Sequence, residues 1–294
     1  MLVDYRYHVG SFVAVFLALL VGILIGIGLA PNPEELNRVV AGLKADNQAT
    51  RQAKEAELQA LREVNRESDI LIKEALAGLV RDRLSGMRVA IVVDHEFDSD
   101  PFASSLRGLL KEAGANVIST TVFTSDFVAL PPEVRHKVAR RLSLYPPPGV
   151  YYRTLIAQAV ARDLVRGRPA LIQELHTMGL LRSSADSDYT LRPEAVLFVG
   201  GCNSPAEAAL ERIDLPMIRE LVSLGLRVVG CEAREVAVSA MPLYRATGVA
   251  TVDNADTPAG RLAVVLALAG AAGHFGVKET ADRFLPEIVP SGGR

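Results

Sequence analysis

A long apolar run near the N-terminus, Ser11 to Ala30, constrains this chain more than any other feature. No ionisable side chain occurs between Val9 and Pro33. About 20 apolar residues match a hydrocarbon core of about 30 Å, whereas the apolar part of a signal peptide has only about 7 to 15 residues. The length therefore predicts an uncleaved transmembrane anchor, with its short flank, over residues 1–33.

The charges that flank this run predict its orientation. The N-terminal flank carries Arg6 and His8 against Asp4, and the far side opens with Glu34 and Glu35. Because positive charge is retained on the cytoplasmic side, we expect a cytoplasmic N-terminus and an extracytoplasmic C-terminal part. The expected location is the cell membrane or envelope, with a single span.

Small side chains recur at every fourth position of the run. They are Gly10, Ala14, Ala18, Gly22, Gly26 and Ala30. Such a stripe lets two helix backbones approach each other, and Gly22 and Gly26 form the GxxxG pair that is typical of helix association in lipid. Alanine and glycine are also common in membrane helices for no such reason. The pattern favours a homo-oligomer, most simply a dimer.

Residues 34–85 are expected to form a stalk, because the stretch from Glu34 to Arg83 is rich in both acidic and basic side chains and predicts one long helix. Apolar residues follow a spacing of three and four, which is typical of a coiled coil. They are Leu36, Val40, Leu43, Leu61, Val64, Leu71 and Ala75. Asn47, Thr50 and Lys54 interrupt this seam, so a solvated single helix is the alternative. About 50 helical residues would reach about 75 Å, which is the length of a stalk.

Residues 86–285 predict an α/β domain with a mostly parallel, Rossmann-like sheet. Apolar strands are expected at 87–93, 115–123, 195–199, 227–229 and 249–252, and helices at 101–113, 204 onward, 215–224 and 258–271. Repeated alternation of strand and helix is typical of a parallel sheet that is covered on both faces. A proline-interrupted helical insertion is expected at about 125–192, and 286–294 forms a tail.

Ligands of such sheets bind beyond the carboxyl ends of the strands, and the loop after the first strand is rich in polar side chains. Its candidate ligands are Asp94, His95, Glu96, Asp98 and Asp100. They could bind a divalent cation or transfer protons. The alternative is a helix entrance, which also favours aspartate.

The two cysteines, Cys202 and Cys231, each follow an expected strand. Two neighbouring thiolates would suit Cu(I), and outside the cytoplasm they could form a disulfide; buried, unconnected thiols are the third possibility. Gly200 and Gly201 could admit an anion, but no GxGxxG pattern or P-loop is present, which disfavours a nucleotide cofactor.

Other functional classes find little support in the sequence. A net charge of -2 and a pI near 6.2 supply no basic surface for nucleic acid. Five histidines are scattered, and no Ser/His/Asp or Cys/His arrangement can be assembled, so no enzyme is predicted.

Both ends of the chain carry the motifs of a known family. They are Asp4-Tyr5-Arg6-Tyr7-His8 with Ser11, Val13 to Leu19 and Gly22 to Gly26 at one end, and Val252-Asp253-Asn254, Thr257-Pro258, Gly260 and Leu262 to Lys278 at the other. In these residues the chain resembles the bacterial copper-transporter family of mycobacterial copper transport protein B (MctB). The resemblance implies an envelope protein with one span, a coiled-coil stalk and an extracytoplasmic Rossmann-like domain.

The resemblance also implies two different roles. The family acts in copper efflux or copper homeostasis, with copper as a possible ligand. A related group of membrane proteins within the superfamily resembles the partner in a complex that controls cell separation through cell-wall hydrolysis. That alternative implies a dimeric scaffold for a protein partner, and an envelope enzyme that uses the Asp94 to Asp100 loop is a third, weaker alternative.

Overall fold

The computed structural model describes residues 5–28, 33–94, 101–143, 145, 151–203 and 210–287. The chain divides into two compact units, Met1–Ser68 and Asp69–Arg294. Each unit is described below by itself.

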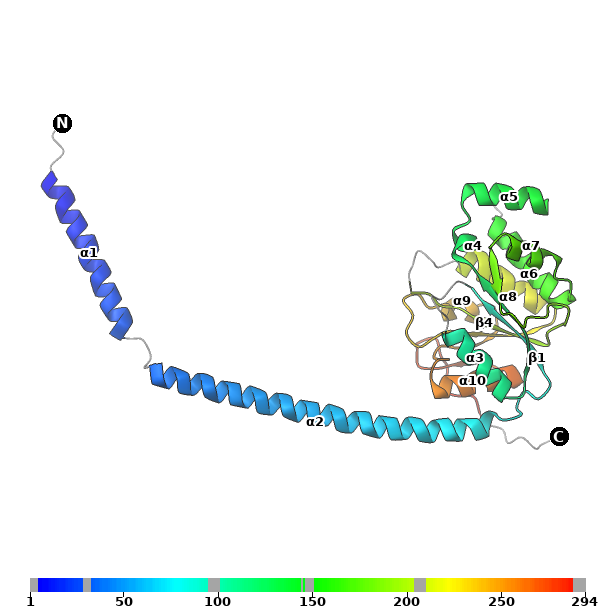
Figure 1. The fold of residues 1–294 in the computed structure, drawn as a ribbon, viewed down its shortest axis with the longest axis horizontal. Helices are drawn as coiled ribbons and strands as arrows, with labels where there is room; N and C mark the ends of the chain where they lie inside the picture. The colour runs from blue at the N-terminus through cyan, green and yellow to red at the C-terminus, as the bar shows by residue number, and fades with distance from the viewer. Residues whose placement is uncertain are drawn as a thin grey trace. The chain divides into compact units, whose positions relative to one another are not determined.

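The first unit begins with helix α1, Tyr5–Gly28 (Figure 1). The segment Val9–Gly28 has a mean hydropathy of 2.7, and none of it is buried by other parts of the protein. A helix that is apolar all round and has no protein contacts is suited to lipid. Among the described residues it is the one candidate membrane span, which confirms the expected N-terminal apolar helix.

Helix α2, Pro33–Val80, is a single helix of 48 residues. A proline is favourable at the first position of a helix, because the backbone N–H that it lacks would have no acceptor there. Turn residues follow at 81–86, and Gly86 has a φ of 73°. The expected helix over Glu34 to Arg83 therefore agrees with the observed one to within a turn. Side chains along its first two thirds are exposed where they are described.

The second unit contains a sheet of seven strands in the order β3-β2-β1-β4-β5-β6-β7. The strands are β1 Arg88–Val93, β2 Asn116–Phe123, β3 Leu181–Ser183, β4 Ala195–Val199, β5 Arg227–Cys231, β6 Ala250–Val252 and β7 His274–Phe275. Every pair is parallel except β2 with β3, which is antiparallel. The mostly parallel sheet is thus confirmed, whereas β3 and β7 were not expected from the sequence.

Two apolar layers cover the sheet because successive side chains of a strand point to opposite faces. In β1, Val89, Ile91 and Val93 belong to one core, and Ala90 and Val92 belong to the other. Figure 1 shows α3, Pro101–Glu112, and α10, Pro258–Ala269, over the first face. The central strands are buried on both faces, which explains the continuous apolar sequences of β1 and β4.

The second face is covered by the segment between β2 and β4 and by later helices. These elements are α4 Ser125–Ala129, α5 Pro132–Leu142, α6 Tyr152–Arg166, α7 Ala170–Thr177, the π-helix η1 Leu210–Asp214, α8 Leu215–Ser223 and α9 Met241–Arg245. Buried side chains of α5, α6, α7 and α8 share one core. The expected helical insertion is therefore part of a covering layer and also supplies edge strand β3. The helix expected to open at Ser204 lies outside the described residues up to Ala209.

The end of α2 is part of the core of the second unit. Leu76 and Val80 are 8% and 0% exposed, and Leu84 in the following turn is 1% exposed. They pack in the core that α3 and α10 also build. The last turns of the long helix thus belong to the α/β domain itself.

Candidate functional site at the carboxyl edge of the sheet

The candidate site lies at the carboxyl edge of the sheet, where the strand order reverses between β1 and β4. Ligands of open α/β sheets bind at such a reversal. Acidic side chains follow three of the central strands directly: Asp94 after β1, Glu232 after β5 and Asp253 after β6. All three are buried, so each needs partners that compensate for lost hydration.

Glu232 has partners on three sides. Its carboxylate accepts hydrogen bonds from Ser239 Oγ at 2.6 Å and from the backbone N–H of Ala240 at 2.8 Å. Lys278 Nζ donates to Glu232 Oε1 at 2.5 Å and forms an ion pair with it. The Glu232 side chain is 0% exposed and that of Lys278 is 23% exposed, so this ion pair is largely hidden from water.

Asp253 fastens the C-terminal segment, residues 274–287, which we call the C-terminal strap. Its two carboxylate oxygens accept hydrogen bonds from the backbone N–H groups of Val277 at 2.8 Å and Lys278 at 2.9 Å. Gly276 lies against the same carboxylate with a φ of 137°, and a Cβ there would collide with it. The segment can approach this closely only because residue 276 is glycine.

Tyr244 of α9 is buried at the carboxyl ends of β4 and β5, against Gly200 and Gly230. Its hydroxyl donates to Asp214 Oδ2 at 2.5 Å, and its ring packs edge-on against Phe198 at 5.6 Å between centroids. Burial, followed by the negative charges of Asp214, Asp94 and Glu232, raises the pKa of the Tyr244 phenol well above its usual value. The tyrosine therefore stays protonated and donates its hydrogen bond at all physiological pH values.

The paired glycines after β4, Gly200 and Gly201, leave the space that the side chains of Tyr244 and Glu232 occupy. A Cβ on Gly200 would collide with the Tyr244 hydroxyl, and one on Gly230 would come within 2.5 Å of Tyr244 Cδ2. A Cβ on Gly201 would lie 2.9 Å from Glu232 Oε2. The space that a side chain would take at Gly200 and Gly201 is thus filled by Tyr244 and Glu232, and an anion at these glycines stays a prediction.

Cys231 is the last residue of β5, and Cys202 follows β4, which is the neighbour of β5 in the sheet. Gly200 N–H donates to Cys231 O at 2.8 Å, and Cys202 forms an isolated bridge with Val238. Both side chains are buried, and the two cysteines form no disulfide with each other. Burial and the Glu232 carboxylate raise the pKa of the Cys231 thiol, so it is protonated in this conformation, whereas Cu(I) binds the thiolate. A metal site at Cys202 and Cys231 stays a prediction.

The acidic loop is described only at its first residue. Asp94 is buried, and its backbone N–H donates to Val199 O at 3.1 Å, whereas His95, Glu96, Asp98 and Asp100 lie outside the described residues. Within the described part of the chain, no three or more His, Cys, Asp or Glu side chains are grouped as a metal site would require.

The small residues of α1 have no partner within the described structure. Nothing lies within 4 Å of a Cβ built on Gly10, Gly22 or Gly26. Ala14 and Ala18 are exposed with them, and Ala30 lies outside the described residues. The stripe thus leaves room for a second helix, as a packing face requires.

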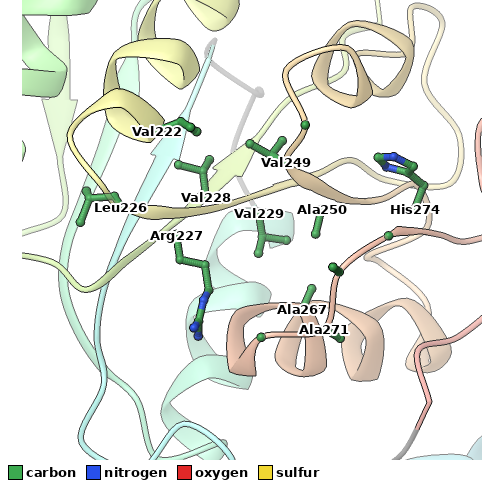
Figure 2. Close-up of a pocket in the computed structure, with 14 residues that line it drawn as sticks. Val222, Leu226, Arg227, Val228, Val229, Val249, Ala250, Ala267, Ala271 and His274 are labelled. Carbon is green, nitrogen blue, oxygen red and sulfur yellow. The ribbon is translucent and has the colours of Figure 1, made fainter.

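A separate open pocket of about 300 Å³ lies near the opposite, amino edge of the sheet (Figure 2). Its wall is mostly valine, leucine and alanine, with Arg227 and His274 on opposite sides. Arg227 Nη1 donates to Leu268 O at 2.6 Å, and His274 Nδ1 lies 3.0 Å from Thr251 Oγ1. Both polar side chains therefore already contact other groups of the protein, and most of the other lining side chains are apolar.

Sequence reasoning found the loops of this site but missed several of its residues. The role of Asp253 is not visible in its loop, whose local pattern is that of a helix cap: Thr257 Oγ1 accepts from Gly260 N–H at 3.1 Å, and Pro258 begins α10. Asp214, Tyr244 and Lys278 carried no local signal, because their partners are distant in the sequence.

Comparisons with known proteins give one family. Residues 2–286 match the family described as copper transport outer membrane protein, MctB. The chain has no match among curated proteins. A solved structure titled as an oxidoreductase from Sinorhizobium meliloti is 12% identical, with a TM-score of 0.26 over 57% of this chain and 36% of that one.

Proposed function

The chain belongs to the MctB family, and from this membership we propose that it is a single-span envelope protein of copper efflux or homeostasis. The family's description, copper transport outer membrane protein, supports the copper role. The observation that supports the anchored location is α1, whose segment Val9–Gly28 is long, apolar and unburied. In this proposal the α/β domain is Rossmann-like and lies outside the cytoplasm, and its reversal of strand order between β1 and β4 supports that relationship.

The proposed role is carried by the α/β domain and not by a channel through one chain. A single helix satisfies its own backbone but cannot enclose a polar path. The segment Val9–Gly28 contains no methionine, cysteine or histidine that could bind copper within the span. Copper conduction would therefore require an oligomer, and copper handling by a monomer would have to take place outside the bilayer.

Cys202 and Cys231 are the proposed copper ligands. Because the Cys231 thiol is buried and protonated, Cu(I) binding must release a proton and open the strand ends. The test is titration of the full chain in non-ionic detergent with Cu(I) against a competing chelator. We expect stoichiometric binding that Cys202→Ser or Cys231→Ser abolishes. Binding that both variants retain would remove the thiols from the proposal.

The orientation has its own test. A reporter that is active only outside the cytoplasm, fused after Arg294, should be active. The same reporter fused before Met1 serves as the matched control and should be inactive. The reverse pair of results would refute the extracytoplasmic location of the α/β domain and the roles that depend on it.

A second candidate function is a dimeric scaffold that binds a protein partner and controls cell-wall hydrolysis. The observation that favours it is the exposed apolar seam of α2, where Val40, Leu43, Leu61, Val64 and Leu71 are all at least 42% exposed in the single chain. A parallel coiled coil of two copies would bury this seam, and pairing of α1 through its small residues would bring the same two copies together.

Single cysteines test the seam. In a parallel dimer, Leu61→Cys places two thiols at the same level of the coiled coil, so an oxidant should crosslink the chains. Arg66→Cys, on the far side of the same helix, is the matched control and should crosslink much less. The native thiols are buried and should not contribute. Equal crosslinking of both variants would contradict the coiled coil.

A further inference from the structure

Two adjoining pockets lie beside β3, the strand at one edge of the sheet. One, of about 400 Å³, extends from the start of α4 to β3, and the other, of about 330 Å³, extends from α7 to the turn that follows β3. His176 and Ser183 line both pockets, so the two meet at these side chains. We call them together the β3 groove. Its size is within the range of sites that bind small molecules.

Polar side chains dominate the lining of the β3 groove, unlike that of the apolar pocket in Figure 2. Seven of its described lining residues carry a hydroxyl group, and two, Ile172 and Leu181, have apolar side chains. Asp126 and Arg182 bring one charge of each sign, so with histidine neutral the described lining has no net charge. Because a hydroxyl both donates and accepts hydrogen bonds, this lining suits an uncharged ligand that itself carries many hydroxyl groups.

Tyr189 fixes the hydroxyl of Ser183, where the two pockets meet. The Tyr189 hydroxyl donates to the carbonyl of Thr120 at 3.3 Å. It also lies 2.6 Å from Ser183 Oγ and 3.0 Å from Thr121 Oγ1. A phenol has one hydrogen, so while Tyr189 donates to Thr120, the hydrogens of the other two hydroxyls point to the phenol oxygen. The Ser183 oxygen then keeps a lone pair that can accept a hydrogen bond from a ligand.

A second pair of hydroxyls is fixed in the turn after β3. Ser184 Oγ lies 2.9 Å from Ser187 Oγ, and Ser187 Oγ accepts a hydrogen bond from Thr120 N–H at 3.1 Å. The pair is therefore tied to the backbone of β2, and both serines are half-buried. Side chains that are held in place before a ligand arrives lose less conformational entropy when it binds.

Helix α7 supplies the adaptable side chains of the β3 groove. Gln173 and His176 lie three residues apart and thus on the same face of this helix. Both are exposed, and neither side chain forms a hydrogen bond or an ion pair within the described part of the chain. An amide and a neutral imidazole each offer a donor and an acceptor, so both side chains can turn to match the hydroxyl groups of a ligand.

We propose that the β3 groove binds the sugar units of an uncharged carbohydrate. An apolar ligand would leave the hydroxyls of the lining without partners, and a phosphorylated one would need an excess of positive charge there. A sugar satisfies the fixed hydroxyls of Ser183, Ser184 and Ser187 and reaches Gln173 and His176 with its other hydroxyl groups. The groove is separate from the candidate site at the ends of β4, β5 and β6 and does not depend on the copper role.

The test is a saturation-transfer NMR titration of the full chain with two uncharged oligosaccharides, maltotetraose and chitotetraose. The detergent is a polyoxyethylene ether, because the headgroup of a maltoside detergent is itself a sugar. His176→Ala is the variant, and His136→Ala, an exposed histidine of α5 that does not line the groove, is the matched control. We expect His176→Ala to weaken binding about three- to tenfold, as the loss of a hydrogen bond does, and His136→Ala to change it less than about twofold.

Gln173→Ala is a second variant and should weaken binding to a similar extent, because its exposed side chain can be removed without disturbing the fold. Tighter binding of chitotetraose supports a groove that also accepts acetamido groups, and tighter binding of maltotetraose supports one that recognises hydroxyl groups alone. Two results would overturn the proposal. One is that neither oligosaccharide shows saturable binding to the unaltered chain. The other is that His176→Ala and His136→Ala bind equally well, because the sugar would then lie elsewhere.

Discussion

Replacing Lys278 by methionine should destabilise the α/β domain, because it removes the ammonium group that neutralises buried Glu232. Leaving one member of a buried ion pair without its partner costs about 3 to 5 kcal/mol. Ser239 Oγ and Ala240 N–H, at 2.6 and 2.8 Å, still donate to the carboxylate, which places the expected cost near the lower limit, about 3 kcal/mol. Methionine keeps the apolar stem of lysine, so little packing is lost.

The assay is urea unfolding of the full chain in detergent, followed by tyrosine fluorescence, since the chain has seven tyrosines and no tryptophan. Arg283→Met is the control: its ion pair with Glu287 is 56% and 85% exposed and should contribute less than about 1 kcal/mol. Adding Glu232→Gln to Lys278→Met should recover part of the loss, because a neutral amide is cheaper to bury. If Lys278→Met costs no more than Arg283→Met, the reasoning about the buried pair is refuted.

Two further predictions concern other contacts of the domain. Gly200→Ala should lower the unfolding free energy by about 2 kcal/mol or more, because the added Cβ would collide with Tyr244. Gly108 lies inside α3 with open space around it, so Gly108→Ala should raise the unfolding free energy by about 0.5 to 1 kcal/mol in the same urea titration. Burial and then the charge of Arg245 lower the pKa of His274 below its usual 6.5, so the folded state resists protonation. The melting temperature should therefore fall as the pH drops below about 6.5 towards the lower folded value, and His274→Asn should flatten that slope.

The parts of the fold that were predictable are those that repeat a local pattern. The anchor is an unbroken apolar run in the sequence, and β1 and β4 are apolar strands because both of their faces are buried. Edge strand β3, Leu181–Ser183, has three residues and β7 has two. Such short strands exist only through pairing with a neighbour and leave no periodicity in the sequence.

The candidate site was harder to predict, because the sequence shows that an acidic residue follows a strand but does not show which residue it contacts. Glu232 directly follows β5, which the sequence predicts, yet its partner is a lysine 46 residues away. Asp214 likewise meets Tyr244 30 residues further on. A carboxylate that binds a ligand and one that accepts hydrogen bonds from the C-terminal strap can have the same local sequence, and only the tertiary contacts distinguish them.

The end of α2 matters for where the α/β domain begins as a stable unit. Leu76, Val80 and Leu84 are almost fully buried in its core, and Leu285 of the C-terminal strap packs against the same core. Burial of each such side chain contributes about 1.5 to 3 kcal/mol, so the three together contribute about 5 to 9 kcal/mol. That amount is comparable with the whole stability of a typical domain, about 5 to 15 kcal/mol. The last turns of the long helix are therefore a structural part of the domain that follows them, and a fragment that begins at Gly86 would lack the side chains that close its core.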